Sequence, residues 1–158
     1  MEISDLSSDV REWLEQSGWF PGRDIGEAEA DRLIGVRVRD AERQGHPLMP
    51  NDAAVRVIRS FGLLTLAHPR GGLALEMRPT VGFDGDAALI TELGENLGRR
   101  LFPVGHDSHD FDPLLVDESG RFFFMHHTGA YFWGSNVQDA FYHFLSDAEE
   151  VDAEDFFV

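Results

Sequence analysis

Residues 101–125 read LFPVGHDSHDFDPLLVDESGRFFFM, and this segment predicts the centre of the fold. Two apolar runs, at 114–116 and 122–125, flank a turn at 118–120 that contains a glycine. Short apolar runs on either side of such a turn are typical of a β-hairpin. We therefore expect a hairpin whose open end carries the polar loop 106–112, and the role of this loop bears most directly on function.

The composition is that of one folded domain. The chain has 158 residues, of which 42% are hydrophobic, enough to bury a core. It has no cysteine, which excludes disulfides, thiolate metal sites and a cysteine nucleophile. No apolar run reaches the roughly 18 residues of a membrane span. Residues 1–6 lack the basic and apolar regions of a signal peptide, so the expected location is the cytoplasm.

The charge balance is strongly acidic and limits the partners. The chain has 13 Lys and Arg residues against 29 Asp and Glu residues, which gives a net charge of −16. Such a field repels nucleic acid and anionic membranes and attracts basic proteins. We therefore expect neither nucleic acid nor membrane as a partner. High solubility or a salt-rich habitat would produce the same balance, so charge alone leaves these explanations open.

Helices and strands follow one another in an order typical of an α+β domain. Apolar residues at helical spacing, with capping residues beside them, predict helices over 7–18, 27–44, 52–61 and 87–100. Shorter apolar segments beside glycine-containing turns predict strands at 63–67 and 73–77, with 129–134 as a turn or short strand. The expected fold is a single domain in which helices pack against an antiparallel or mixed β-sheet.

The last predicted helix begins at Ser135, because Gln138 stands three residues further on, as in a capping box. We expect the domain to span residues 1–146 and an acidic tail to span 147–158. The tail holds six carboxylates and no cation, and it ends in Phe-Phe-Val. An acidic run is ordinarily solvated, whereas the apolar end favours docking against the fold or a partner.

Five short motifs occur in an order and spacing that are similar to one known family. They are GWFPGR at 18–23, FGLL at 61–64, PVG at 103–105, LVDESGRF at 115–122, and Gly134-Ser135 before a helix over 140–145. In these motifs the chain resembles the SUKH superfamily, particularly its third subgroup, over roughly residues 5–146. Where this chain has FGLL, the family more often has FGGL. We expect this departure, at Leu64, to remove the backbone freedom of one glycine.

The resemblance implies a SUKH-like α+β domain without enzymatic activity. Such proteins are immunity proteins of bacterial polymorphic-toxin systems, which bind a cognate toxin domain in the cytoplasm. The toxin domain is often a nuclease, and the subgroup shares no catalytic residues to carry over. Because a nuclease needs positive surface to hold phosphates, a strongly acidic inhibitor can steer onto it and cover that surface.

The predicted partner-binding residues are acidic side chains and imidazoles of two loops, together with one tryptophan: Asp84, Asp86, His106, Asp107, His109, Asp110, Asp112 and Trp133. Trp133 is included because it lies in a turn between Gly129 and Gly134 that is expected to be exposed. In contrast, Trp13 and Trp19 are expected to pack in the core. No catalytic residue, metal or cofactor is expected.

Two alternatives stay open. The first is a small metal-dependent hydrolase centred on His106 and His109, with further ligands from His126, His127 or His143. The three-residue spacing does not match a His-x-His motif, and adjacent residues of a strand face opposite sides, so His126 and His127 are not expected to share a metal. The second is a regulatory binding module of the same fold. Genomic neighbourhood separates it from an immunity protein, whose gene normally lies beside the toxin gene.

Overall fold

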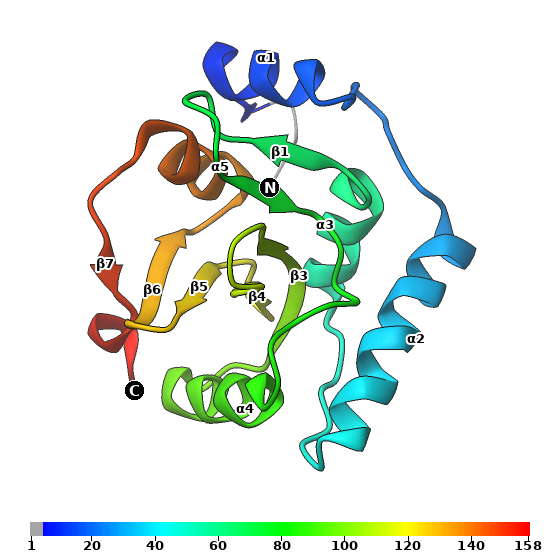
Figure 1. The fold of residues 1–158 in the computed structure, drawn as a ribbon, viewed down its shortest axis with the longest axis vertical. Helices are drawn as coiled ribbons and strands as arrows, with labels where there is room; N and C mark the ends of the chain where they lie inside the picture. The colour runs from blue at the N-terminus through cyan, green and yellow to red at the C-terminus, as the bar shows by residue number, and fades with distance from the viewer. Residues whose placement is uncertain (1–4) are drawn as a thin grey trace.

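One antiparallel β-sheet forms the centre of the fold in a computed structural model that describes residues 5–158 (Figure 1). Chain order and spatial order of the strands are the same: β1 (Thr65–Ala67), β2 (Ala74–Glu76), β3 (Leu101–Asp107), β4 (Pro113–Asp117), β5 (Phe122–His126), β6 (Gly129–Gly134) and β7 (Val151–Asp152). The predicted α+β class is confirmed, and the sheet is antiparallel rather than mixed. Residues 1–4, which carry most of the signal-peptide expectation, lie outside the described residues.

Among the described residues, three α-helices pack directly on strands of the sheet, and two further α-helices pack on those helices. The helices are α1 (Ser8–Gln16), α2 (Glu27–Arg43), α3 (Asp52–Phe61), α4 (Asp86–Leu97), α5 (Val137–Ser146) and the 3₁₀ helix η2 (Ala153–Phe156). Helix α3 packs on β3 and β4, α4 packs on β3, and α5 packs on β6. Helix α2 lies outside α3, as Figure 1 shows, and α1 contacts α5. Within residues 5–158, no helix is both long and apolar enough to cross a membrane.

The two strands of the predicted central hairpin are buried on both faces. All of β4 and the first four residues of β5 are buried, which agrees with their nearly uninterrupted apolar sequences. On one face, the ring of Phe122 contacts that of Phe141 in α5, which in turn contacts Phe61 in α3. On the other face, the ring of Phe123 contacts those of Phe132 and Phe156. The core therefore has aromatic packing on both sides of β5.

The segment 147–158, predicted as an acidic tail, adds β7 to the edge of the sheet and then forms η2. The ring of Phe156 lies 4.1 Å from that of Phe132 in β6. At the end of the chain, the Val158 N–H donates a hydrogen bond of 3.0 Å to the Asn96 carbonyl in α4. Of the apolar end, Phe156 therefore docks against the fold, whereas the side chains of Phe157 and Val158 are exposed.

The predicted capping box at Ser135 is wrong. Asn136 caps α5, because its side-chain oxygen accepts a hydrogen bond of 2.9 Å from the Asp139 N–H. The carboxamide of Gln138 bonds instead to Ser7, accepting from its N–H at 2.8 Å and donating to its hydroxyl at 3.1 Å. Gln138 thus ties the start of α5 to the start of α1 rather than capping its own helix.

The missing glycine of the FGLL motif was expected at Leu64, and the structure corrects its position to Leu63. Leu63 has φ of 71°, in the left-handed region that favours glycine, whereas Leu64 is buried in the core. This backbone geometry lets the Leu63 N–H donate to the Met77 carbonyl at 2.8 Å and the Met77 N–H donate to the Leu64 carbonyl at 2.9 Å. The two hydrogen bonds continue the antiparallel pairing of β1 and β2 beyond the Thr65–Glu76 pair.

A buried ion pair joins α2 to the start of α4. The guanidinium of Arg37 donates to the carboxylate of Asp86, and both side chains are 0% exposed. The other oxygen of Asp86 accepts from the Gln44 carboxamide at 3.2 Å. A Cβ at position 82 would overlap the Asp86 carboxylate, so the chain needs Gly82 at this close approach. This pair fixes α2 to the start of α4.

Replacing Arg37 with Met should therefore lower the free energy of unfolding by about 3–5 kcal/mol, because it leaves the buried Asp86 carboxylate without an opposite charge. The free energy of unfolding is measured by urea titration, with circular dichroism as the signal. The control is Arg32→Met on the same helix, whose exposed ion pair with Glu29 should contribute little. The double variant Arg37→Met/Asp86→Leu should recover most of the loss. Equal urea midpoints for wild type and Arg37→Met would contradict this role.

Candidate functional site

The polar loop at the open end of the hairpin is shorter than predicted. His106 and Asp107 belong to β3, because Glu76 of β2 pairs with His106 on one side and Pro113 of β4 pairs with it on the other. The loop therefore spans only residues 108–112. Both β3 residues are buried, so the prediction that the loop begins at His106 is wrong.

Asp107 holds the loop from inside. One of its carboxylate oxygens accepts hydrogen bonds from the N–H groups of Asp110, at 3.2 Å, and Asp112, at 3.0 Å. The Asp107 N–H also donates to the Asp112 carbonyl at 3.0 Å. These bonds satisfy backbone donors that the tight turn would otherwise leave without partners. Asp107 thus shapes the loop and does not display its charge to solvent.

The two histidines of the predicted hydrolase centre bind backbone carbonyls. His106 Nδ1 lies 2.7 Å from the Asp107 carbonyl oxygen, and His109 Nε2 is hydrogen-bonded to the Gly72 carbonyl oxygen. In the part of the chain that the structure describes, neither imidazole belongs to a cluster of metal-ligating side chains. The geometry therefore gives no support to a metal-dependent hydrolase centred on His106 and His109.

The remaining predicted site residues lie in separate environments. Asp84 is exposed in the loop before α4, whereas Asp86 is buried in the ion pair with α2. Trp133 is only 7% exposed, and its ring stacks on those of Phe124, at 4.6 Å, and His143, at 5.1 Å. The expected exposure of Trp133 is wrong, because residues 129–134 form β6 and α5 covers Trp133 on that strand.

Three of the eight predicted residues are exposed: Asp84, His109 and Asp110. The structure adds one residue that sequence reasoning missed. Phe111 is 46% exposed at the tip of the 108–112 loop, and its φ of 58° lies in the left-handed region. A large side chain held there is a sign of local strain, which is frequent at functional positions. The available signal in the sequence was a lone aromatic residue between acidic ones.

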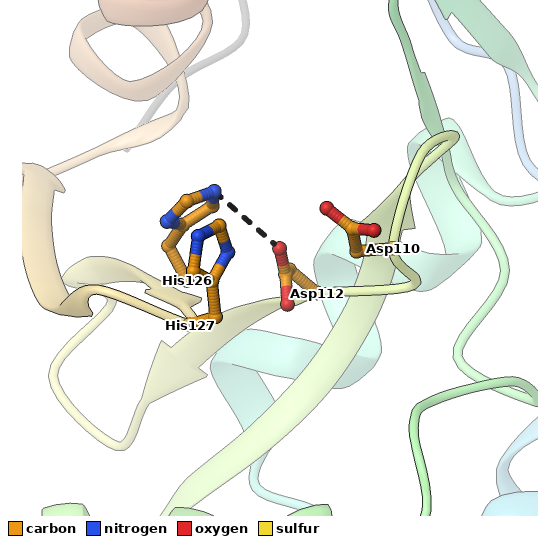
Figure 2. A group of neighbouring side chains, drawn as sticks. All are labelled: Asp110, Asp112, His126 and His127. Carbon is orange, nitrogen blue, oxygen red and sulfur yellow. Dashed lines mark ion pairs between the residues drawn. The ribbon is translucent and has the colours of Figure 1, made fainter.

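Asp110 and Asp112 lie next to His126 and His127 at the end of β5 (Figure 2). One possible ligand atom from each of Asp110, Asp112, His126 and His127 lies within 4.8 Å of all the others. The prediction that the two imidazoles point to opposite sides is wrong, since their ring centres are 3.8 Å apart. The reason is that β5 ends at His126, so His127 already belongs to the turn and does not follow strand alternation.

The register of the hairpin explains this meeting. Leu114 of β4 pairs with Phe124 of β5, and continuing the antiparallel pairing by two residues places Asp112 opposite His126. Asp112 is 3% exposed, and burial, followed by the neighbouring Asp107 carboxylate, raises its pKa above the ordinary value. The imidazole of His126 acts in the opposite direction. These four side chains are the described residues that could hold a metal ion.

Asp107→Ala should loosen the loop, because it removes the acceptor of two N–H groups, and an unsatisfied buried N–H costs about 1–3 kcal/mol. We expect the amides of Asp110 and Asp112 to exchange with deuterium roughly tenfold faster, measured by NMR. Asp107→Asn keeps the accepting oxygen and serves as the control with exchange close to wild type. Equal exchange in the alanine variant would show that the loop is held by other contacts.

Comparison with known protein families places the chain beside an immunity-protein family. The family described as SUKH-3 immunity protein matches the chain over residues 6–147. The matched region includes all five α-helices and strands β1 to β6. No curated protein and no solved structure matched the chain.

Proposed function

The chain belongs to the SUKH-3 immunity protein family, and from this premise we propose that it binds a cognate bacterial toxin domain in the cytoplasm and neutralises it. The observation that carries the proposal is the family match across nearly the whole fold. Neutralisation is by binding, with no chemical step. The expected toxin domain is basic, and a nuclease is the partner that best fits the charge of this chain.

The distribution of charge supports a basic partner. The net charge is −16, and residues 122–158 hold seven carboxylates without a single Lys or Arg. Six of these seven carboxylates lie in residues 147–155, so the segment around β7 and η2 concentrates negative charge at one edge of the sheet. A nuclease presents cations to the phosphates of its substrate. An acidic surface can attract those cations and occupy the same positions.

The proposed contact surface is the tip of the loop between β3 and β4. Phe111 offers an exposed aromatic ring, and the exposed Asp110 and His109 lie beside it in the sequence. Buried aromatic anchors surrounded by polar groups are the residues that contribute most to protein–protein affinity. Asp84 remains a proposed peripheral contact that contributes through its charge.

The buried members of the predicted set have a supporting role in this proposal. They are Asp86, His106, Asp107, Asp112 and Trp133. A side chain that is buried in the free protein cannot meet a rigid partner directly, and most interfaces move little on binding. Asp107 supports the proposed surface directly, because its carboxylate holds the loop backbone.

The proposal predicts protection of cells. Bacteria that express the toxin domain encoded beside this gene should survive when the chain is co-expressed, and the two proteins should purify as a stable complex. An unrelated toxin domain serves as the specificity control. If the neighbouring toxin domain kills equally with and without the chain, and no complex forms in vitro, the immunity proposal is wrong.

A second measurement tests the surface. Phe111→Asn removes the ring, and asparagine tolerates the left-handed backbone. We expect the dissociation constant for the toxin domain to rise roughly 30-fold, as for the loss of an aromatic anchor worth about 2 kcal/mol. Phe20→Asn, which removes a ring exposed elsewhere on the molecule, is the matched control. Equal affinities of the two variants would place the contact surface away from the loop.

A further inference from the structure

One buried carboxylate oxygen lacks a hydrogen-bond partner among the described residues. Asp112 is 3% exposed, and its Oδ2 makes no hydrogen bond. The nearest basic group is His126 Nε2 at 3.9 Å, which is beyond hydrogen-bonding distance. Buried polar atoms are almost always paired, and a missing ion is one explanation when they are not. The oxygen therefore marks a position where a positively charged group would be stabilised.

The surroundings of this oxygen supply the other ligands of a metal ion. Figure 2 shows the imidazoles of His126 and His127 on one side and the carboxylates of Asp110 and Asp112 on the other, facing a common space. Their possible ligand atoms all lie within 4.8 Å of one another. Ligand atoms around a tetrahedral zinc ion are roughly 3.5 Å apart, so closure needs shifts of about 1 Å. Asp110 and His127 are exposed and free to make them.

The orientation of His126 is fixed from behind. Its Nδ1 lies 2.9 Å from the hydroxyl oxygen of Thr128, and that oxygen lies 2.7 Å from the hydroxyl of Tyr131. The Thr128 N–H donates to the same Nδ1 at 3.3 Å, so Thr128 holds the ring at this nitrogen through both its backbone and its side chain. Metal-bound histidines are typically oriented by a hydrogen-bonding partner at the ring nitrogen that does not bind the metal. The arrangement thus orients the His126 ring with Nε2 on the side of the cluster.

We propose that Asp110, Asp112, His126 and His127 form a binding site for a divalent transition-metal ion of the zinc type. Two imidazoles and two carboxylates suit zinc, whereas magnesium and calcium prefer oxygen ligands alone. The ion would join the loop before β4 to the turn after β5, so its role is to clamp the open end of the hairpin. The site does not depend on the proposed function, because it rests on side chains of the free chain.

Zinc titration of metal-free, tag-free protein by isothermal calorimetry is the direct test. We expect one zinc ion per chain with a dissociation constant in the micromolar range or below, and a rise in melting temperature on zinc addition. Magnesium at millimolar concentration should produce neither effect. Several weak zinc ions per chain, as expected of a merely acidic surface, would overturn the proposal.

Single substitutions assign the site. Asp112→Asn and His127→Gln should each weaken zinc binding at least tenfold and abolish the zinc-dependent rise in melting temperature. His127 is exposed, so its variant keeps the fold even if the change at the buried Asp112 does not. The matched controls are His46→Gln and Asp84→Asn, both exposed and outside the cluster, which should bind zinc like the wild type. Wild-type zinc affinity in a folded His127→Gln or Asp112→Asn variant would refute the site.

Discussion

The pairing of β4 with β5, buried on both faces, is the constraint on which the rest of the structure depends. Antiparallel sheets commonly leave one face to water, but here Phe122 and Phe123 point to opposite faces and both are fully buried. Each face therefore needs a cover. Helices α3 and α5 supply aromatic rings on the side of Phe122, and η2 supplies Phe156 on the side of Phe123. The C-terminal segment is thus part of the core packing.

The same pairing also determines which side chains meet at the open end of the hairpin. It carries the loop before β4 and the turn after β5 to one place, and so brings carboxylates of one segment to imidazoles of the other. Asp107 folds the loop from within, which leaves Asp112 buried and turned toward the histidines while Phe111 stays at the surface. One short loop thereby presents an aromatic ring outward and a carboxylate inward.

Local pattern predicted the helices and the central hairpin, because apolar spacing and turn residues act over a few neighbours. It left open whether the sheet is antiparallel or mixed, because that depends on pairing between distant segments. Burial of Trp133, His106 and Asp107 was not predictable in this way, since it depends on pairing with β2 and on cover by α5. The meeting of Asp112 with His126 follows from the register of the hairpin, which the structure supplies and the sequence prediction did not specify. The prediction that His126 and His127 face opposite sides failed because β5 ends at His126, so the alternation of side chains along a strand does not extend to His127.

β7 also has a consequence for self-association. The outer strand of a sheet presents free N–H and C=O groups, to which a strand of another molecule can add. Here that position is taken by only two residues, flanked by Glu149, Glu150, Glu154 and Asp155, all exposed. A second copy that approached this margin would meet its own negative charge on a very short template. The acidic segment therefore disfavours strand addition by a second copy at this edge of the sheet.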